Sequence, residues 1–214
     1  MTVTNGLLIA SLLCAAGYFL RLGSAPSFPR SSFKTMSITA LGVIAVISDA
    51  PLLLVLALGF SAVGDLALSR EGERAFMIGL GAFLLAHIFY VPLLVSAGEG
   101  FSGWRWAALF GAVAYAVVVA RWLWPHLGPM RIPVAVYMTA IVAMGAAAIT
   151  APLALWPILL GAALFIASDT VLAAETFVYA DKPRRWTAPV IWSTYYAGQA
   201  LIASAWLCPH FSGR

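Results

Sequence analysis

Residues 51–69 read PLLLVLALGFSAVGDLALS, a nearly unbroken apolar run that contains one carboxylate, Asp65. A run of this length predicts a membrane-spanning helix, because about 20 predominantly apolar residues cross the hydrocarbon core. An ionised Asp at the centre of such a helix costs roughly 2.5 to 3.5 kcal/mol on insertion scales, so an acid in this position is a functional-site hypothesis.

A second stretch, residues 161–169 (GAALFIASD), repeats this pattern and ends at Asp169. Each aspartate follows a small residue, Gly64 or Ser168, inside a run that is otherwise almost free of charge. The two acids have similar predicted depths. We therefore expect Asp65 and Asp169 to share one site.

The composition predicts an all-α, polytopic membrane bundle. Hydrophobic residues make up 63% of the 214-residue chain and charged residues 9%, whereas soluble domains carry about 25% charged residues. The apolar runs leave no room for an extramembrane domain, so we expect residues 1–214 to form a single domain. Eight transmembrane helices are predicted, at about 5–21, 33–49, 51–69, 75–97, 104–124, 131–150, 152–176 and 187–208.

The distribution of basic residues predicts how the chain is oriented in the membrane. Cytoplasmic loops carry an excess of Lys and Arg, and with eight helices ten of the twelve basic residues fall on one side. We therefore expect a multi-pass protein of a bacterial inner membrane with both termini outside the cytoplasm. The ten residues are Arg21, Arg30, Lys34, Arg70, Arg74, Arg121, Arg131, Lys182, Arg184 and Arg185, and the other two are Arg105 and Arg214.

Several site classes are not favoured. The basic residues are spread over short loops, which does not indicate nucleic-acid binding. The two cysteines, Cys14 and Cys208, show no metal-binding or disulfide spacing. His87 lies near mid-membrane, whereas His126 and His210 lie near opposite ends, so a zinc site with three or four ligands is not expected. No metal or organic cofactor is predicted.

Polar residues on three predicted helices accompany the two aspartates. Ser61 lies one helical turn before Asp65, on the same face. Two stripes, on the fourth and eighth predicted helices, could line a polar cavity; alternatively, their polar groups form hydrogen bonds between helices, each worth about 0.6 to 2 kcal/mol. The stripes comprise Gly79, Phe83, His87 and Tyr90, and Trp192, Tyr195, Tyr196 and Gln199.

An internal duplication is a further hypothesis. Aligning Asp65 with Asp169 also aligns Glu71 with Glu175, and each acidic helix is third in a set of four. Because four is an even number, the two halves would be parallel repeats, unlike the inverted repeats of many transporters. The match is short, so a duplication and a chance similarity both stay open.

The stretches that end at the two aspartates and the two polar stripes contain four motifs that resemble those of the YhhN family, the lysoplasmalogenase-like membrane proteins. The resemblance implies an eight-helix enzyme that hydrolyses the vinyl ether bond of lysoplasmalogens, releasing a fatty aldehyde and glycerophospho-ethanolamine or -choline. It also implies that Asp65 and Asp169 are the catalytic pair. The motifs are Ser61-x-x-Gly64-Asp65-x-x-Leu68, Gly79-x-x-x-Phe83-x-x-x-His87-x-x-Tyr90, Gly161-x-x-x-Phe165-x-x-Ser168-Asp169 and Tyr195-x-x-x-Gln199-x-x-Ile202.

Paired carboxylates suit this reaction, because one can deliver a proton to carbon while the other stabilises the cation and activates water, as at glycosidic bonds. On this hypothesis a lysophospholipid is the substrate, and its contacts include Ser61, His87, Tyr90, Ser168, Tyr195 and Gln199. Two alternatives remain: a proton-coupled transporter that uses the same aspartates as a relay, and a structural lipid-binding bundle.

Overall fold

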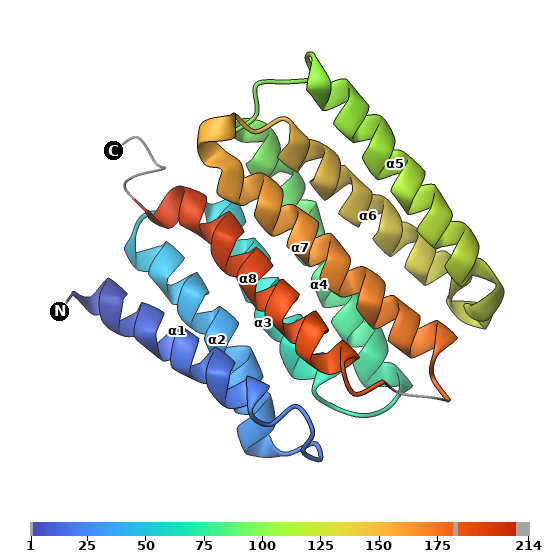
Figure 1. Cartoon of the computed structure of the whole chain (residues 1–214). Helices are drawn as coiled ribbons and strands as arrows, with labels where there is room; N and C mark the ends of the chain where they lie inside the picture. The colour runs from blue at the N-terminus through green and yellow to red at the C-terminus, as the bar shows by residue number, and fades with distance from the viewer. Residues whose placement is uncertain (1, 182–183, 209–214) are drawn as a thin grey trace. The chain divides into compact units, whose positions relative to one another are not determined.

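The computed structural model describes residues 2–181 and 184–208, and within them every element is helical (Figure 1). Of the residues discussed above, Lys182, His210 and Arg214 lie outside the described part. The α-helices are α1 (Val3–Phe19), α2 (Phe28–Ile47), α3 (Leu52–Leu68), α4 (Glu73–Ser96), α5 (Trp104–Leu123), α6 (Arg131–Ile149), α7 (Trp156–Ala173) and α8 (Thr187–Leu207). A π-helical segment, η4 (Ala174–Val178), continues α7, and short 3-10 turns η1 (Trp124–His126), η2 (Gly128–Met130) and η3 (Leu153–Leu155) flank α6 and α7.

The helix that differs most from the prediction is α2. It begins at Phe28, five residues before the predicted start, and Pro29 lies in its first turn. Proline suits this position because its fixed φ matches the helix and its missing N–H would have no helical partner there. Arg30, which lies before the predicted helix, is therefore a helical residue, and this corrects the sequence analysis; Lys34, close to the predicted start, lies further inside the helix than expected.

Four segments are long and apolar enough to cross a membrane. They are Glu73–Ser96, Trp104–His126, Gly128–Ile149 and Leu153–Val178, while Val3–Phe19 and Leu52–Leu68 are apolar but shorter. A 17-residue helix is about 25 Å long, near the lower limit for a span. The chain is thus a multi-pass integral membrane protein, and eight spans stay a prediction.

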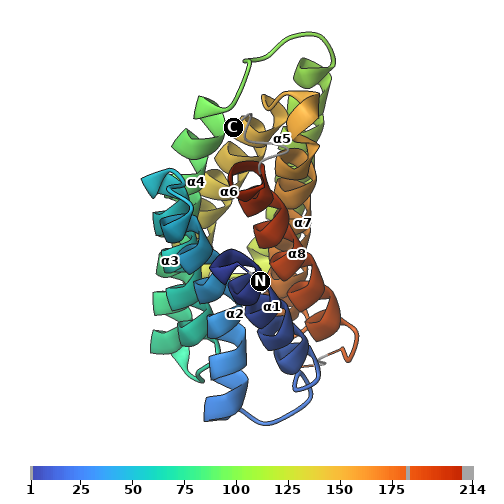
Figure 2. The ribbon, with the colours of Figure 1, turned by 90° about the vertical axis from the view of Figure 1, so that its left-hand side faces the viewer.

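The chain divides into two compact units, each of which is described by itself. Unit 1 comprises Met1–Leu93 and Ala203–Arg214. Within it α2 packs against both α1 and α3, and α1 and α2 lie side by side in both views (Figures 1 and 2). Ser11 on α1 donates a 2.7 Å hydrogen bond to the carbonyl of Ser37 on α2. The prediction of a single domain is not tested by this division.

Unit 2 comprises Leu94–Ile202. Within it α6 packs against α5 and α7. The backbones of α7 and α8 approach closely where two glycines face each other. A Cβ added to Gly161 would lie 2.8 Å from the carbonyl oxygen of Gly198, and a Cβ added to Gly198 would lie 2.8 Å from the carbonyl oxygen of Gly161. Small residues permit this approach, which is a common way for membrane helices to associate.

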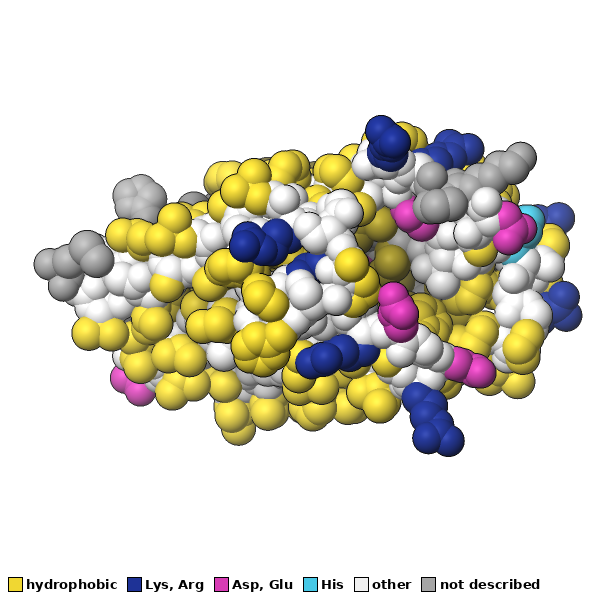
Figure 3. Space-filling view, turned by 90° about the horizontal axis from the view of Figure 1, so that it is seen from below, with side chains coloured by type: hydrophobic (Ala, Val, Ile, Leu, Met, Phe, Trp, Pro, Cys, Tyr) yellow, Lys and Arg dark blue, Asp and Glu magenta, His cyan; other side chains and the backbone are white. Residues whose placement is uncertain are grey.

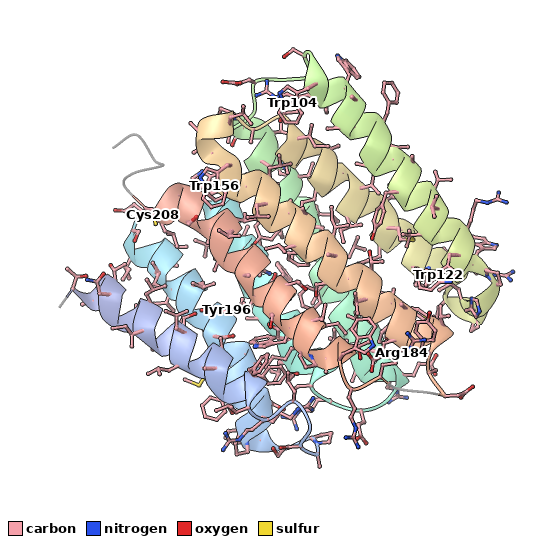
Figure 4. All side chains as sticks on the ribbon, in the orientation of Figure 1. Trp104, Trp122, Trp156, Arg184, Tyr196 and Cys208 are labelled. Atoms are coloured by element: carbon pink, nitrogen blue, oxygen red, sulfur yellow. The ribbon has the colours of Figure 1, made fainter. Side chains whose placement is uncertain are left out.

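Three tryptophans of unit 2 lie at helix ends, where the amphipathic rings of an interfacial aromatic belt are found. Trp104 begins α5, Trp122 lies in its last turn, and Trp156 begins α7 (Figure 4). All three are substantially exposed, between 40% and 51%. Amphipathic rings at both ends of α5 are typical of a helix that reaches both interfaces.

Candidate functional site

Asp65 is buried in unit 1, on the last turn-and-a-half of α3, and is 1% exposed. Its Oδ1 lies 3.1 Å from Nζ of Lys34 on α2. A charge in an apolar setting needs a close partner of opposite charge, because its desolvation is otherwise uncompensated. The sequence analysis did not include Lys34 in the site.

Lys34 reaches Asp65 from the second turn of α2, which begins six residues before it. Its side chain is 14% exposed, and its ammonium also lies 5.9 Å from the ring centroid of Tyr18 on α1. A lysine inside a membrane helix usually faces the bundle interior and pairs with an acid. In the sequence, Lys34, Thr35, Ser37 and Thr39 mark this segment as unusually polar for a membrane helix, but nothing there links Lys34 to Asp65.

The other predicted site residues of unit 1 are fully buried. Ser61 lies one turn before Asp65, and its hydroxyl donates a 2.8 Å hydrogen bond to the carbonyl of Ala57 within α3. His87 Nδ1 lies 2.6 Å from the carbonyl oxygen of Phe83 within α4. Tyr90, one turn further along α4, is 0% exposed.

Gly64, directly before Asp65, brings α3 and α4 together. A Cβ at Gly64 would lie 2.6 Å from the ring of Phe83, the residue whose carbonyl contacts His87. The predicted stripe on α4 therefore packs against α3 through Phe83. The carboxylate helix and the histidine helix are held in register at this contact.

Asp169 is the corresponding carboxylate of unit 2. Its Oδ2 accepts a 2.5 Å hydrogen bond from the hydroxyl of Tyr137 on α6. The next residue, Thr170, accepts a 2.9 Å hydrogen bond from Tyr115 on α5. Two tyrosines on neighbouring helices thus donate to consecutive residues of α7. Sequence analysis did not include Tyr137, for which the only available signal was a tyrosine inside an apolar helix.

Ser168, Tyr195 and Gln199 are the remaining predicted site residues, all in unit 2 and all buried. The Ser168 hydroxyl donates a 2.9 Å hydrogen bond to the carbonyl of Ile191 on α8, so this serine links two helices. The Tyr195 ring packs edge-on against Phe165 with centroids 5.4 Å apart.

The two carboxylates have equivalent surroundings in one respect. Each lies on the third helix of its half of the chain, and its partner lies on the preceding helix, 31 residues earlier for Lys34 and 32 for Tyr137. They differ in charge, because Asp65 faces a cation and Asp169 a neutral phenol. The two aspartates belong to different units, so a shared site stays a prediction.

Within 2–181 and 184–208 there is no group of three His, Cys, Asp or Glu side chains placed to hold a metal ion. The polar partners of Asp65 and Asp169 are donors, Lys34 and Tyr137, that suit a carboxylate.

The helical fold and its buried carboxylates define a class, the multi-pass integral membrane proteins with intramembrane acids. Comparison with known proteins then shows the family. The YhhN family model matches residues 29–206, and the chain belongs to this family, as the motifs indicated. The match begins in α2 and ends in α8, and so includes both aspartates and both of their partners.

Curated relatives of this chain are named lysoplasmalogenase. A Mycobacterium bovis protein named lysoplasmalogenase is 36% identical over 168 residues, 75% of this chain and 61% of that protein. Human lysoplasmalogenase TMEM86A is 32% identical over 162 residues, 67% of this chain and 60% of that protein. The alignments thus cover about three fifths of these relatives' lengths. No solved structure matches the chain significantly.

Proposed function

We propose that this protein is a membrane-embedded hydrolase that cleaves the vinyl ether bond of lysoplasmalogen-type lysophospholipids, with Asp65 and Asp169 as the catalytic acids. Family membership and the names of the relatives support the substrate class. The observation that carries the residue assignment is that each carboxylate lies in an apolar helix and is held by a donor from the preceding helix. Intramembrane acids with a specific partner mark functional sites.

The chemistry needs a proton on carbon and a water on the neighbouring carbon. Protonation of the alkenyl chain at its β-carbon gives an oxocarbenium ion, water adds to it, and the resulting hemiacetal loses the glycerol oxygen. The products are a fatty aldehyde and a glycerophospho-ethanolamine or -choline. One carboxyl group supplies the first proton, and an ionised one accepts a proton from water. General acid–base catalysis of this kind contributes about 10² to 10⁴ in rate.

The different partners support different roles for the two groups. Asp65 forms an ion pair with Lys34, so we assign it the ionised role, as the base that accepts a proton from water. Asp169 accepts a hydrogen bond from a neutral phenol, and we assign it the role of proton donor. Paired carboxylates divide their tasks in this way when their environments differ.

The remaining site residues are proposed to contact the substrate or the water. His87, Tyr90, Tyr195 and Gln199 carry polar groups at buried positions of α4 and α8. Ser61 and Ser168 donate their single hydroxyl proton to backbone carbonyls, so toward a substrate they act as acceptors.

The membrane arrangement proposed with this function has eight spans and both termini outside the cytoplasm of a bacterial cell. The equivalent partners of Asp65 and Asp169 also support a parallel duplication of a four-helix unit. Such a duplication would explain why each half supplies one carboxylate.

Aldehyde release tests the function directly. Purified protein in detergent is given 1-alkenyl lysophosphatidylcholine or lysophosphatidylethanolamine, and wild type is compared with Asp65→Asn and Asp169→Asn. We expect aldehyde from wild type and at least a hundredfold less from either variant, since each removes one acid–base group. Asp49→Asn, the same change in the turn after α2, is the matched control and keeps full activity.

Two outcomes would contradict the proposal. If folded wild type releases no aldehyde from either head group, the substrate assignment is wrong, and proton-coupled transport by the same aspartates becomes the alternative to test. If both Asn variants retain activity, the carboxylates are not the catalytic groups.

A further inference from the structure

Two basic side chains of α2 lie over one aromatic ring in unit 1. Cζ of Arg30 is 5.5 Å and Nζ of Lys34 is 5.9 Å from the ring centroid of Tyr18, which is 6% exposed. Residues four apart share a helix face. Arg30 and Lys34 therefore form a cationic pair one helical turn long, and its inner end contacts Asp65.

The contact with Asp65 does not use all the N–H donors of this cationic pair. Asp65 offsets the charge of Lys34, but an ammonium has three N–H groups. Arg30 stacks on the Tyr18 ring, and its buried Nε has no hydrogen-bond partner among the described residues. A guanidinium stacked on an aromatic face keeps its in-plane donors, in the fork that matches phosphate oxygens.

We propose that Arg30 and Lys34 bind the phosphate of the lysophospholipid head group, with Arg30 as the main phosphate ligand. This inference rests on the proposed function and adds to it the residues that recognise the charged end of the substrate. Lys34 then bridges the phosphate and the Asp65 carboxylate. The apolar chain of the lipid needs no such partner.

The spacing of the two cations agrees with the size of the substrate. Four residues of α-helix rise about 6 Å, which is the offset along α2 between Arg30 and the lysine that contacts Asp65. In a lysoplasmalogen, five single bonds of about 1.5 Å separate the vinyl ether oxygen from phosphorus, a span of about 6 Å when extended. A phosphate at Arg30 thus places the reacting bond at the depth of the carboxylate.

The corresponding helix of unit 2 lacks this arrangement. Arg131 begins α6 and stacks on Trp124 at 5.5 Å, but its Nε donates to the carbonyl of Trp124, and the residue that contacts Asp169 is the neutral Tyr137.

Arg70 and Arg74, at the α3–α4 connection, are exposed. Figure 3 shows the face seen from below in Figure 1, toward which the α1–α2 connection lies, with Lys and Arg side chains among hydrophobic ones.

Binding measurements test this assignment without turnover. A 1-alkyl lysophosphatidylcholine has no vinyl ether and is not cleaved, and 1-alkylglycerol lacks the phosphate; both are titrated into purified protein in detergent. For Arg30→Met we expect about tenfold weaker binding of the phospholipid, since a charge-assisted hydrogen bond is lost, and unchanged binding of the alkylglycerol. Arg30→Lys, which keeps the charge, recovers part of the affinity.

Arg131→Met is the matched control, because it removes a guanidinium that stacks on an aromatic ring at the same distance, 5.5 Å. We expect it to bind both ligands like wild type. The inference is overturned if Arg30→Met binds the phospholipid normally, or if it loses affinity for both ligands equally, which would indicate a packing defect around Tyr18. Competition by inorganic phosphate as strong as that by glycerophosphocholine would show a free-anion site instead of a head-group site.

Turnover gives a second readout. With 1-alkenyl lysophosphatidylcholine, Arg30→Met is expected to raise KM about tenfold and leave kcat within twofold, since the acids are untouched. If wild type cleaves no vinyl ether but Arg30→Met still weakens phospholipid binding, the proposed function fails and the phosphate site stands. Normal KM in an active Arg30→Met protein would refute the phosphate site alone.

Discussion

The hydroxyl of Tyr137 donates a 2.5 Å hydrogen bond to Oδ2 of Asp169, linking α6 to α7 inside unit 2. The bond fixes the orientation of a carboxyl group that otherwise stands on an apolar helix. A positioned acid contributes to catalysis through the direction in which it presents its proton. Tyr137 is therefore a positioning residue for Asp169 on the proposed mechanism.

Tyr137→Phe removes this hydrogen bond and keeps the aromatic ring. We expect kcat for aldehyde release to fall about tenfold, since the Asp169 carboxylate that forms on proton transfer loses this bond, and a hydrogen bond to a charged group is worth about 1.5 to 3 kcal/mol. Tyr115→Phe is the matched control, because Tyr115 donates a bond of 2.9 Å to the adjacent residue, Thr170, and should cost a similar amount of stability without loss of kcat. Equal kcat losses in the two variants would assign Tyr137 a structural role only.

The Lys34–Asp65 ion pair predicts a pattern of non-additive stability changes. Lys34→Met removes the ammonium that lies 3.1 Å from the buried Asp65 carboxylate, and breaking a buried pair from one side costs roughly 3 to 5 kcal/mol. We expect a clear drop in the midpoint of thermal unfolding in detergent. The double variant Lys34→Met/Asp65→Asn should unfold at a higher temperature than Lys34→Met alone, because the buried negative charge is removed together with the lysine.

Lys34→Arg serves as the control for charge, since it keeps the cation. Its unfolding midpoint should lie between those of wild type and Lys34→Met. A double variant less stable than Lys34→Met would show that Lys34 and Asp65 contribute independently, contrary to the ion-pair interpretation.

The contact between α7 and α8 predicts a strong effect of one added methyl group. A Cβ at Gly161 would meet the carbonyl oxygen of Gly198 at 2.8 Å and the backbone nitrogen of Ile202 at 3.0 Å. Backbone atoms cannot rotate away, so Gly161→Ala should cost about 1 to 3 kcal/mol by overpacking. Gly111→Ala on α5, where nothing lies within 4 Å, is the matched control and should be neutral or slightly stabilising. Equal unfolding midpoints would refute the close approach.

Much of the helical fold follows from the sequence, because membrane helices are marked by long apolar runs and by loop charges. The predicted and observed bounds differ most at the start of α2, where Pro29, Arg30 and two serines made residues 28–32 resemble a loop. The basic residues that made the start of this helix hard to recognise, Arg30 and Lys34, also carry the proposed site contacts. A charge that is paired inside the protein is indistinguishable, in a single sequence, from a charge in a loop.

The two aspartates could be found from the sequence because an acid in an apolar run is costly in any arrangement. Their partners could not, since Tyr137 and Lys34 are separated from them by about 30 residues and no periodicity links neighbouring helices. The roles of Ser61 and Ser168 were equally inaccessible. The Ser61 hydroxyl donates a hydrogen bond within its own helix, whereas the Ser168 hydroxyl donates one to α8, although the two serines lie in similar motifs.

The membrane arrangement predicts opposite accessibility for two thiols on either side of helices α4 to α8. Four of these five helices are long and apolar enough to span the membrane, and α8 is not among them, so α8 decides the outcome. In a Cys14→Ser background, we expect a membrane-impermeant maleimide to label the exposed Cys208 (Figure 4) in intact spheroplasts. A cysteine introduced by Glu71→Cys, in the α3–α4 connection, should react only after lysis, because five spans place it on the opposite side. Labelling of both thiols in intact spheroplasts would mean that an even number of these helices cross, and the eight-span arrangement would be wrong.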